Sequence, residues 1–81
     1  MAAPMLEVVV TSAARVLFTG RAGSVSFPGE QGTFEVLPLH RPLVSRLVGG
    51  LVWIDGQSIP IRRGVAKVAD DTVTAVVELS E

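Results

Sequence analysis

Residues 27–43 read FPGEQGTFEVLPLHRPL and hold three of the five prolines, two glycines and the only histidine of the chain within a run of apolar side chains. Pro28 has no backbone N–H to contribute to a sheet, and Gly29 and Gly32 accept the positive φ that a tight reversal requires. Residues 28–32 are therefore predicted to form a turn between two strands.

A short strand is predicted to follow that turn. Residues 33–37 alternate in character, with Phe34 and Val36 on one face, which is typical of a half-buried strand. Residues 38–42 begin and end with proline and are expected to form a second irregular segment. The stretch as a whole predicts two shaped loops that are held by one short strand.

The rest of the chain consists of short apolar segments separated by turn residues, with no long helical pattern. This spacing predicts an all-β fold, a small β-sandwich of about eight to ten short, mainly antiparallel strands. Residues 1–81 are expected to form a single domain. The expected strands cover residues 6–11, 15–20, 22–28, 33–37, 43–48, 51–54, 57–62, 65–69 and 72–79.

The alternation also predicts which side chains face the core. Val16 and Phe18 are expected to share one face of their strand, with Leu17 on the opposite face. The side chains predicted to point inward from the first and third strands are Leu6, Val8, Val10, Val25 and Phe27.

Several turns can be assigned from residue type. Asp55-Gly56 is the pair typical of a two-residue type I′ hairpin, and Asp70-Asp71 is interpreted as a solvated turn. Arg63-Gly64 is interpreted as another reversal, and Pro60 predicts an edge strand or a bulge. Residues 43–48 fit either a short helical turn or a strand or irregular segment, of which we prefer the second.

Composition favours a protein that contacts other proteins. The chain has 81 residues, of which 48% are hydrophobic and 19% charged, and its formal net charge is -1. A core of this size cannot hold so many apolar side chains, and exposed apolar patches commonly mark interfaces.

The scattered basic residues argue against nucleic-acid binding. The start lacks a signal peptide, and no apolar run approaches the ~20 residues of a membrane helix, so a soluble, cytoplasmically made protein is expected.

The order Pro-Gly-x-x-Gly-x-Phe-x-Val-Leu-Pro-x-His-x-Pro-Leu at residues 28–43 resembles the N-terminal β-sandwich of the epsilon subunit of rotary ATP synthases. Leu-Phe-Thr-Gly at residues 17–20 and the segment 63–68 extend the resemblance over nearly the whole chain. Glu35 and Leu39 stand where many members of that family have glycine, and Arg41 stands where alanine is usual.

The resemblance implies a non-catalytic subunit of the central stalk, or rotor, with no cofactor and no membrane insertion of its own. Its direct partners would be the gamma subunit and the c-ring, and the catalytic alpha and beta subunits would be indirect ones. It would couple ion-driven rotation of the ring through gamma to ATP synthesis or hydrolysis. The complex would place it peripherally on the cytoplasmic side of the bacterial inner membrane.

By position, the resemblance assigns one loop to each direct partner. The residues expected to face the c-ring are Glu30, Gln31, Gly32 and Thr33, and those expected to meet gamma are Leu39, His40, Arg41, Pro42 and Ser45. Members of the family commonly continue into a C-terminal helical hairpin that can inhibit ATP hydrolysis. This sequence stops after its last expected strand, so a short form without that autoinhibition is expected.

Few residues suggest a catalytic, metal-binding or phosphate-binding site. A zinc site normally uses three or four protein ligands, so His40 without a second histidine or any cysteine gives a metal site little support. His40 is interpreted either as a loop histidine bonded to backbone or, as the resemblance implies, as a subunit contact. No serine lies in a Gly-x-Ser-x-Gly context, and residues 28–32 lack the Lys-Ser/Thr of a phosphate-binding loop. The alternative function is a free-standing β-sandwich that binds a small ligand or peptide, and a small enzyme has the least support.

Overall fold

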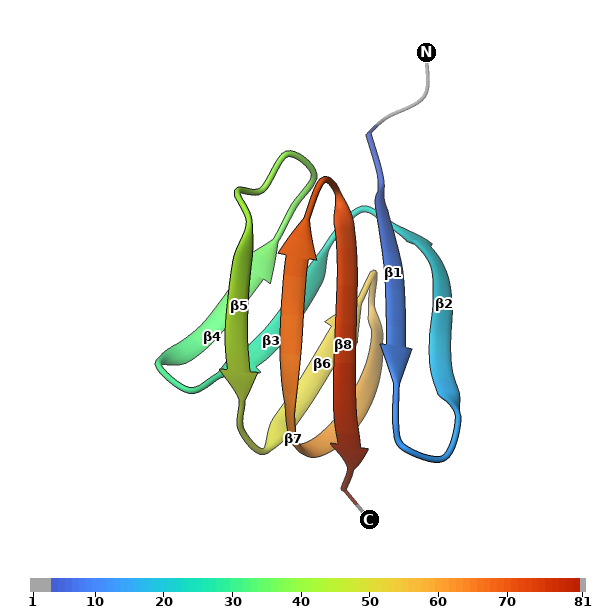
Figure 1. Cartoon of the computed structure of the whole chain (residues 1–81), viewed down its shortest axis with the longest axis vertical. Helices are drawn as coiled ribbons and strands as arrows, with labels where there is room; N and C mark the ends of the chain where they lie inside the picture. The colour runs from blue at the N-terminus through green and yellow to red at the C-terminus, as the bar shows by residue number, and fades with distance from the viewer. Residues whose placement is uncertain (1–3, 81) are drawn as a thin grey trace.

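The computed structural model describes residues 4–80, which form eight β-strands (Figure 1). The prediction of a small, mainly antiparallel all-β fold is confirmed. No helix within the described range is long and apolar enough to cross a membrane. The strands are β1 (Leu6–Thr11), β2 (Val16–Ala22), β3 (Val25–Gly29), β4 (Gly32–Val36), β5 (Leu43–Leu47), β6 (Gly50–Ile54), β7 (Gln57–Ala69) and β8 (Thr72–Leu79).

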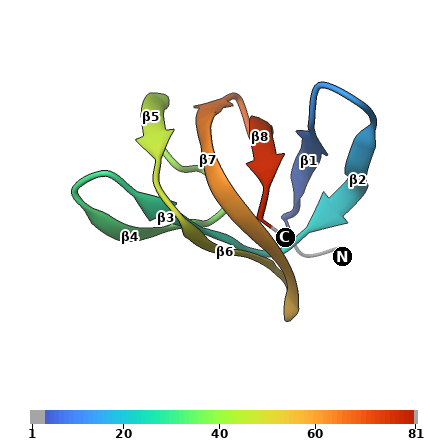
Figure 2. The ribbon, with the colours of Figure 1, turned by 90° about the horizontal axis from the view of Figure 1, so that it is seen from below.

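The strands lie in two layers (Figure 2). One layer runs in the order β2-β1-β8-β7-β5, and β4, β3 and β6 form the other. All neighbouring strands are antiparallel except β1 and β8, which are parallel. The two layers face each other as a sandwich.

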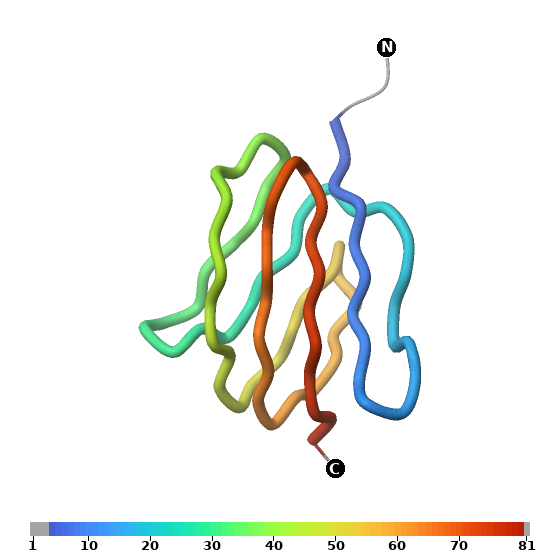
Figure 3. Tube along the Cα trace, in the orientation of Figure 1, coloured from blue at the N-terminus to red at the C-terminus, as the bar shows by residue number. Residues whose placement is uncertain are grey.

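The 13-residue strand β7 belongs to both layers, and its crossing can be followed along the Cα trace (Figure 3). Its first residues, Gln57 to Ile61, pair with β6, and from Gly64 onward it pairs with β5. A register shift against β8 between Ile61 and Arg63 bends the strand at the crossing. Of the two alternatives predicted from Pro60, an edge strand or a bulge, this irregularity close to Pro60 fits the bulge.

The predicted reversal at Arg63-Gly64 is wrong, because β7 continues through both residues. A Cβ atom on Gly64 would lie 2.5 Å from the carbonyl oxygen of Val76 and 2.9 Å from Cγ1 of Val77. Gly64 therefore allows β8 to approach β7 closely. A glycine needed for close packing and a glycine needed for a turn look alike in the sequence.

The predicted turn at residues 28–32 is shorter than expected, because β3 continues through Pro28 and Gly29. Only Glu30 and Gln31 form the turn, and Gly32, with φ +122°, begins β4. Pro28 is tolerated inside the strand because it lies between the residues of β3 that pair with β6 and the one that pairs with β5. Its carbonyl accepts a hydrogen bond from the Val48 N–H at 2.9 Å.

Both aspartate-containing hairpin turns are confirmed. Asp55 and Gly56 have φ of 46° and 88°, and Asp70 and Asp71 have φ of 52° and 58°, as type I′ turns require. Residues 43–48 contain the strand β5, so the alternative of a helical turn is wrong.

The core lies between the two layers, and the predicted inward faces are largely confirmed. Leu6, Val8, Val10, Val25 and Phe27 are all buried. The second strand differs, because Val10 pairs with Phe18 while Thr11 pairs with Val16. Leu17 is the extra residue of this irregular pairing, so simple alternation fails there. As a result Leu17 and Phe18 both pack against the core, and Val16 is exposed.

Candidate functional site

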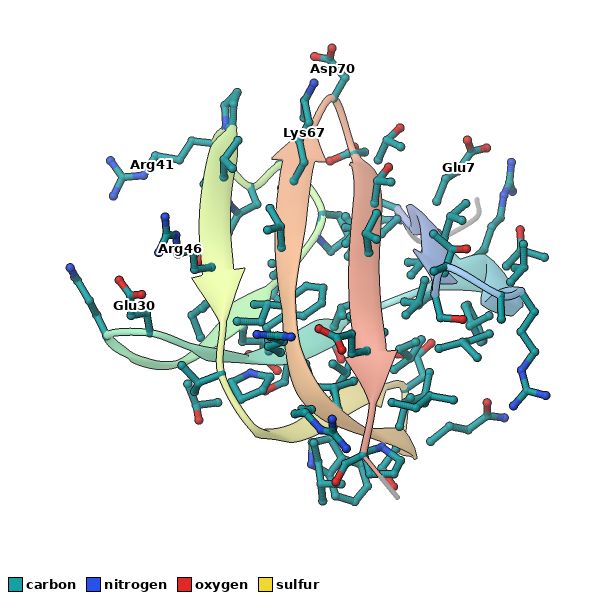
Figure 4. All side chains as sticks on the ribbon, turned by 60° about the horizontal axis from the view of Figure 1, so that its bottom comes forward. Glu7, Glu30, Arg41, Arg46, Lys67 and Asp70 are labelled. Carbon is teal, nitrogen blue, oxygen red and sulfur yellow. The ribbon has the colours of Figure 1, made fainter. Side chains whose placement is uncertain are left out.

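The two loops assigned to different partners border one cleft. This cleft, of about 720 Å³, lies between the β3–β4 hairpin and β5. Figure 4 shows Glu30, Arg41 and Arg46 on this side of the molecule. Of the predicted contact residues, the structure brings together Glu30, Gln31, Gly32, Thr33, His40, Arg41 and Ser45, whereas Leu39 and Pro42 do not line the cleft.

His40 is held by backbone groups at the rim of this cleft. The backbone N–H of His40 donates a hydrogen bond to the Leu37 carbonyl at 3.1 Å. The ring nitrogen Nδ1 lies 2.6 Å from the Arg41 carbonyl oxygen. A carbonyl oxygen only accepts hydrogen bonds, so Nδ1 of His40 is the donor in this contact. Residues 4–80 bring together no group of three His, Cys, Asp or Glu side chains that could hold a metal ion. The geometry favours His40 as a loop histidine with its ring bonded to backbone.

Leu39 has an unusual backbone conformation for a branched apolar residue. Its φ is +69°, in the left-handed region that favours glycine, and its side chain is 84% exposed. The Leu39 N–H donates to Oδ1 of Asp71 at 2.7 Å. Leu39 therefore occupies a position whose left-handed backbone geometry glycine would adopt without steric cost.

Two aspartates of the hairpin turns bind other loops, and sequence reasoning missed both roles. Asp71 is not purely solvated, because it accepts the Leu39 N–H. Asp55 accepts hydrogen bonds from the N–H groups of Gly23 and Ser24, the closest at 2.9 Å. Nothing local in the sequence indicates these pairings, because the partners lie more than 30 residues apart.

The two arginines at the cleft have few acidic side chains near them to balance their positive charge. Arg41 and Arg46 line it and make no salt bridge within the described chain, and Glu30 is the one acidic lining residue. Sequence reasoning missed Arg46, whose signal was only its place among the residues after the Pro-x-His-x-Pro motif. Elsewhere, Arg63 donates a hydrogen bond to Glu78, which lowers the pKa of that carboxyl below its usual range.

The outer face of the larger layer carries a row of apolar side chains. Val65 on β7 lies opposite Val76 on β8. Val76 in turn lies opposite Thr11 on β1, and Thr11 lies opposite Val16 on β2. The three valines are about half exposed, and Val44 on β5 is more exposed. Such open apolar surface is typical of a face that another protein covers.

The opposite layer also exposes large apolar side chains, namely Leu51 and Trp53 on β6. Trp53 is 43% exposed, so the core covers only part of its side chain. Apolar surface on both outer faces, with polar and charged groups along the cleft, defines a class of protein. These features are typical of a small β-sandwich that contacts other proteins.

The matching family model is described as "ATP synthase, Delta/Epsilon chain, beta-sandwich domain" and covers residues 5–81. The chain belongs to this family. It is 40% identical over 78 residues to the ATP synthase epsilon chain of Nitratiruptor sp., covering 90% of this chain and 60% of that one. It is 33% identical over 88 residues to the ATP synthase epsilon chain of Bordetella petrii, covering 94% and 62%. The chain thus spans about 60% of the length of these curated relatives.

Solved structures show the same fold. A chain in the cryo-EM structure of the Euglena gracilis mitochondrial ATP synthase matches with a TM-score of 0.82 at 18% identity, over 95% of this chain and 52% of the other. A chain in the cryo-EM structure of the Tetrahymena thermophila mitochondrial ATP synthase central stalk and c-ring matches with a TM-score of 0.73 at 10% identity, over 90% and 63%.

Proposed function

We propose that this chain is the β-sandwich part of a central-stalk subunit of a rotary ATP synthase. In this role it links the c-ring to the gamma subunit and transmits ion-driven rotation toward catalytic sites on other subunits. The observation that carries the proposal is the family match over residues 5–81, together with relatives named ATP synthase epsilon chain.

The physical properties of the sandwich support a mechanical role. A close-packed core resists deformation, and the core here joins both layers through side chains that are almost fully buried. The bent strand β7 links the two layers covalently. A load applied to one outer face is therefore passed to the other with little change of shape.

The subunit is proposed to be non-catalytic and to lie peripherally on the cytoplasmic side of the bacterial inner membrane, as part of the complex. Residues 30–33 are proposed to face the c-ring. Leu39, His40, Arg41, Pro42 and Ser45 are proposed to meet gamma. Support for neighbouring contact sites comes from the shared cleft, because two partners that approach its two rims would lie side by side.

The proposal is tested by affinity purification of the tagged chain from gently solubilised membranes of its native cell, with mass spectrometry of what is recovered. Co-recovery of the gamma, alpha, beta and c subunits is expected. The double substitution Val65→Glu and Val76→Glu places two charges on the apolar outer face and is expected to reduce recovery. Gln57→Glu, which adds a charge at the end of the β6–β7 hairpin and on neither apolar outer face, serves as the control. Recovery of none of these subunits with the unaltered chain would overturn the proposal.

A further inference from the structure

The strand β5 leaves part of its edge unpaired. On one side it pairs along its whole length with β7, from Leu43 opposite Val68 to Leu47 opposite Gly64. On the other side its only ladder partner is Gly29 of β3, opposite Leu47. The carbonyl of Arg46 accepts the Glu30 N–H at 3.1 Å, so the backbone groups of Arg46 point away from β7.

The alternation of an antiparallel ladder extends this result to Val44. Residues two apart on a strand direct their N–H and C=O groups to the same side, and no register shift interrupts the pairing of β5 with β7. The N–H and C=O of Val44 and the N–H of Arg46 therefore point toward the cleft. None of the three has a hydrogen-bond partner in the structure of residues 4–80. Unpaired groups at this spacing form a template for another strand.

The cleft beside this edge has the size and chemistry to hold an extended chain. Its volume is about 720 Å³, and the half-buried Phe34 and Leu43 contribute apolar surface to its lining. The guanidinium groups of Arg41 and Arg46 are exposed and have no salt bridge there, against the single carboxylate of Glu30. The excess charge is positive, which is complementary to an acidic segment.

We propose that this cleft receives an extended, acidic segment of a partner polypeptide, which pairs with the free edge of β5 as an added strand. Backbone hydrogen bonds to Val44 and Arg46 supply affinity, and carboxylates beside Arg41 and Arg46 supply selectivity. A second copy of this chain is disfavoured, because antiparallel pairing of two β5 edges would bring their arginines together. The cleft is bordered by the loops proposed above to meet the c-ring and gamma, and the peptide experiment tests strand addition separately from that stalk assignment.

The probe is a fluorescein-labelled peptide of about eight residues, a usual strand length, in which valine and glutamate alternate. Binding to the full 81-residue chain is followed by fluorescence anisotropy, and its place by amide shifts in ¹⁵N spectra. The expected result is saturable binding with the largest shifts at residues 43–46. Lysine in place of glutamate, or N-methylation of alternate peptide amides, is expected to weaken binding by about tenfold or more.

Variants separate backbone pairing from charge. Val44→Pro removes an N–H that bonds to nothing in the free chain and is expected to abolish binding, whereas Val44→Thr keeps the N–H and the binding. Arg46→Glu is expected to weaken binding about tenfold, and Arg15→Glu, away from the cleft, to leave it unchanged.

The proposal is overturned if no binding is detected, if the lysine or N-methylated peptide binds equally well, or if the shifts lie elsewhere. Self-association through β5 without peptide would also overturn it, and the N-methylated peptide decides the matter if Val44→Pro fails to fold.

Discussion

Oδ1 of Asp71 lies 2.7 Å from the backbone nitrogen of Leu39, and this hydrogen bond joins the β7–β8 turn to the loop between β4 and β5. Both residues have positive φ. The loop that carries His40 and Arg41 is therefore positioned by a turn more than 30 residues away in the sequence.

Asp71→Gly is expected to lower the free energy of unfolding by about 1 kcal/mol, because glycine tolerates the positive φ but cannot accept the Leu39 N–H. Urea unfolding measures the change, and the Leu39 amide is expected to exchange faster with solvent. Asp70→Gly is the matched control, since Asp70 has the same conformation and its carboxylate accepts no hydrogen bond in the described structure. Equal losses in the two variants would contradict the assigned role of Asp71.

Leu39→Gly is expected to raise the free energy of unfolding, by up to about 1 kcal/mol. It relieves a left-handed conformation that costs roughly 1–2 kcal/mol for a residue with a side chain, and the added entropy of the unfolded chain offsets part of that gain. Little burial is lost, because the side chain is exposed. Leu37→Gly, at a nearby residue without positive φ, is expected to destabilise. Thermal unfolding of both variants decides the issue, and a clear loss with Leu39→Gly would refute the assignment of strain.

Gly64→Ala is expected to destabilise the fold by about 1–3 kcal/mol, because the new methyl group would overlap the Val76 carbonyl and Val77. Gly49→Ala provides the comparison, since a Cβ there would lie 3.6 Å from the Arg62 carbonyl oxygen, an ordinary contact. Urea unfolding of the two variants should separate them clearly. A tolerated Gly64→Ala would mean that β7 and β8 do not approach as closely as described.

The lowered pKa of Glu78 predicts that the free energy of unfolding depends on pH. Its pKa in the folded chain is lowered, mainly because Arg63 donates a hydrogen bond to the carboxylate. A lowered pKa means that the pair stabilises the fold above the ordinary pKa of glutamate, and that this stabilisation is lost as the pH falls through the lower folded value. A double-mutant cycle of Glu78→Gln and Arg63→Gln should give a small coupling at neutral pH that disappears in acid. The effect is small because both side chains are exposed to solvent. Coupling that persisted with Glu78 fully protonated would argue against this origin.

Arg41→Glu is expected to weaken assembly with gamma under the proposed function, because it reverses an exposed charge on the loop assigned to that partner. Co-expression of the chain with gamma, followed by purification of the complex, measures the yield. Arg21→Glu, on the far edge strand, is the charge-matched control. An unchanged yield for Arg41→Glu would remove this loop from the proposed contact with gamma.

Much of the fold could be predicted because its signals are local. Asp55-Gly56 and Asp70-Asp71 define their turns through their own φ preferences, and strict alternation identified the buried faces of β1 and β3. The prediction of a residue's role failed where that role depends on a contact with a strand far away in the sequence. Gly64 is required by β8 and not by a turn, and Leu17 is displaced by an irregular pairing with β1.

The sequence by itself determined the all-β class, the Asp55-Gly56 and Asp70-Asp71 hairpin turns and the motif that marks the family, because these depend on residue type and short-range periodicity. Only the tertiary structure decided that β7 serves both layers, that Asp71 holds Leu39, and that Arg41 and Arg46 share a cleft beside an unpaired edge. Those relationships depend on register and on contacts between segments far apart in the chain, and local patterns do not specify which segments will meet.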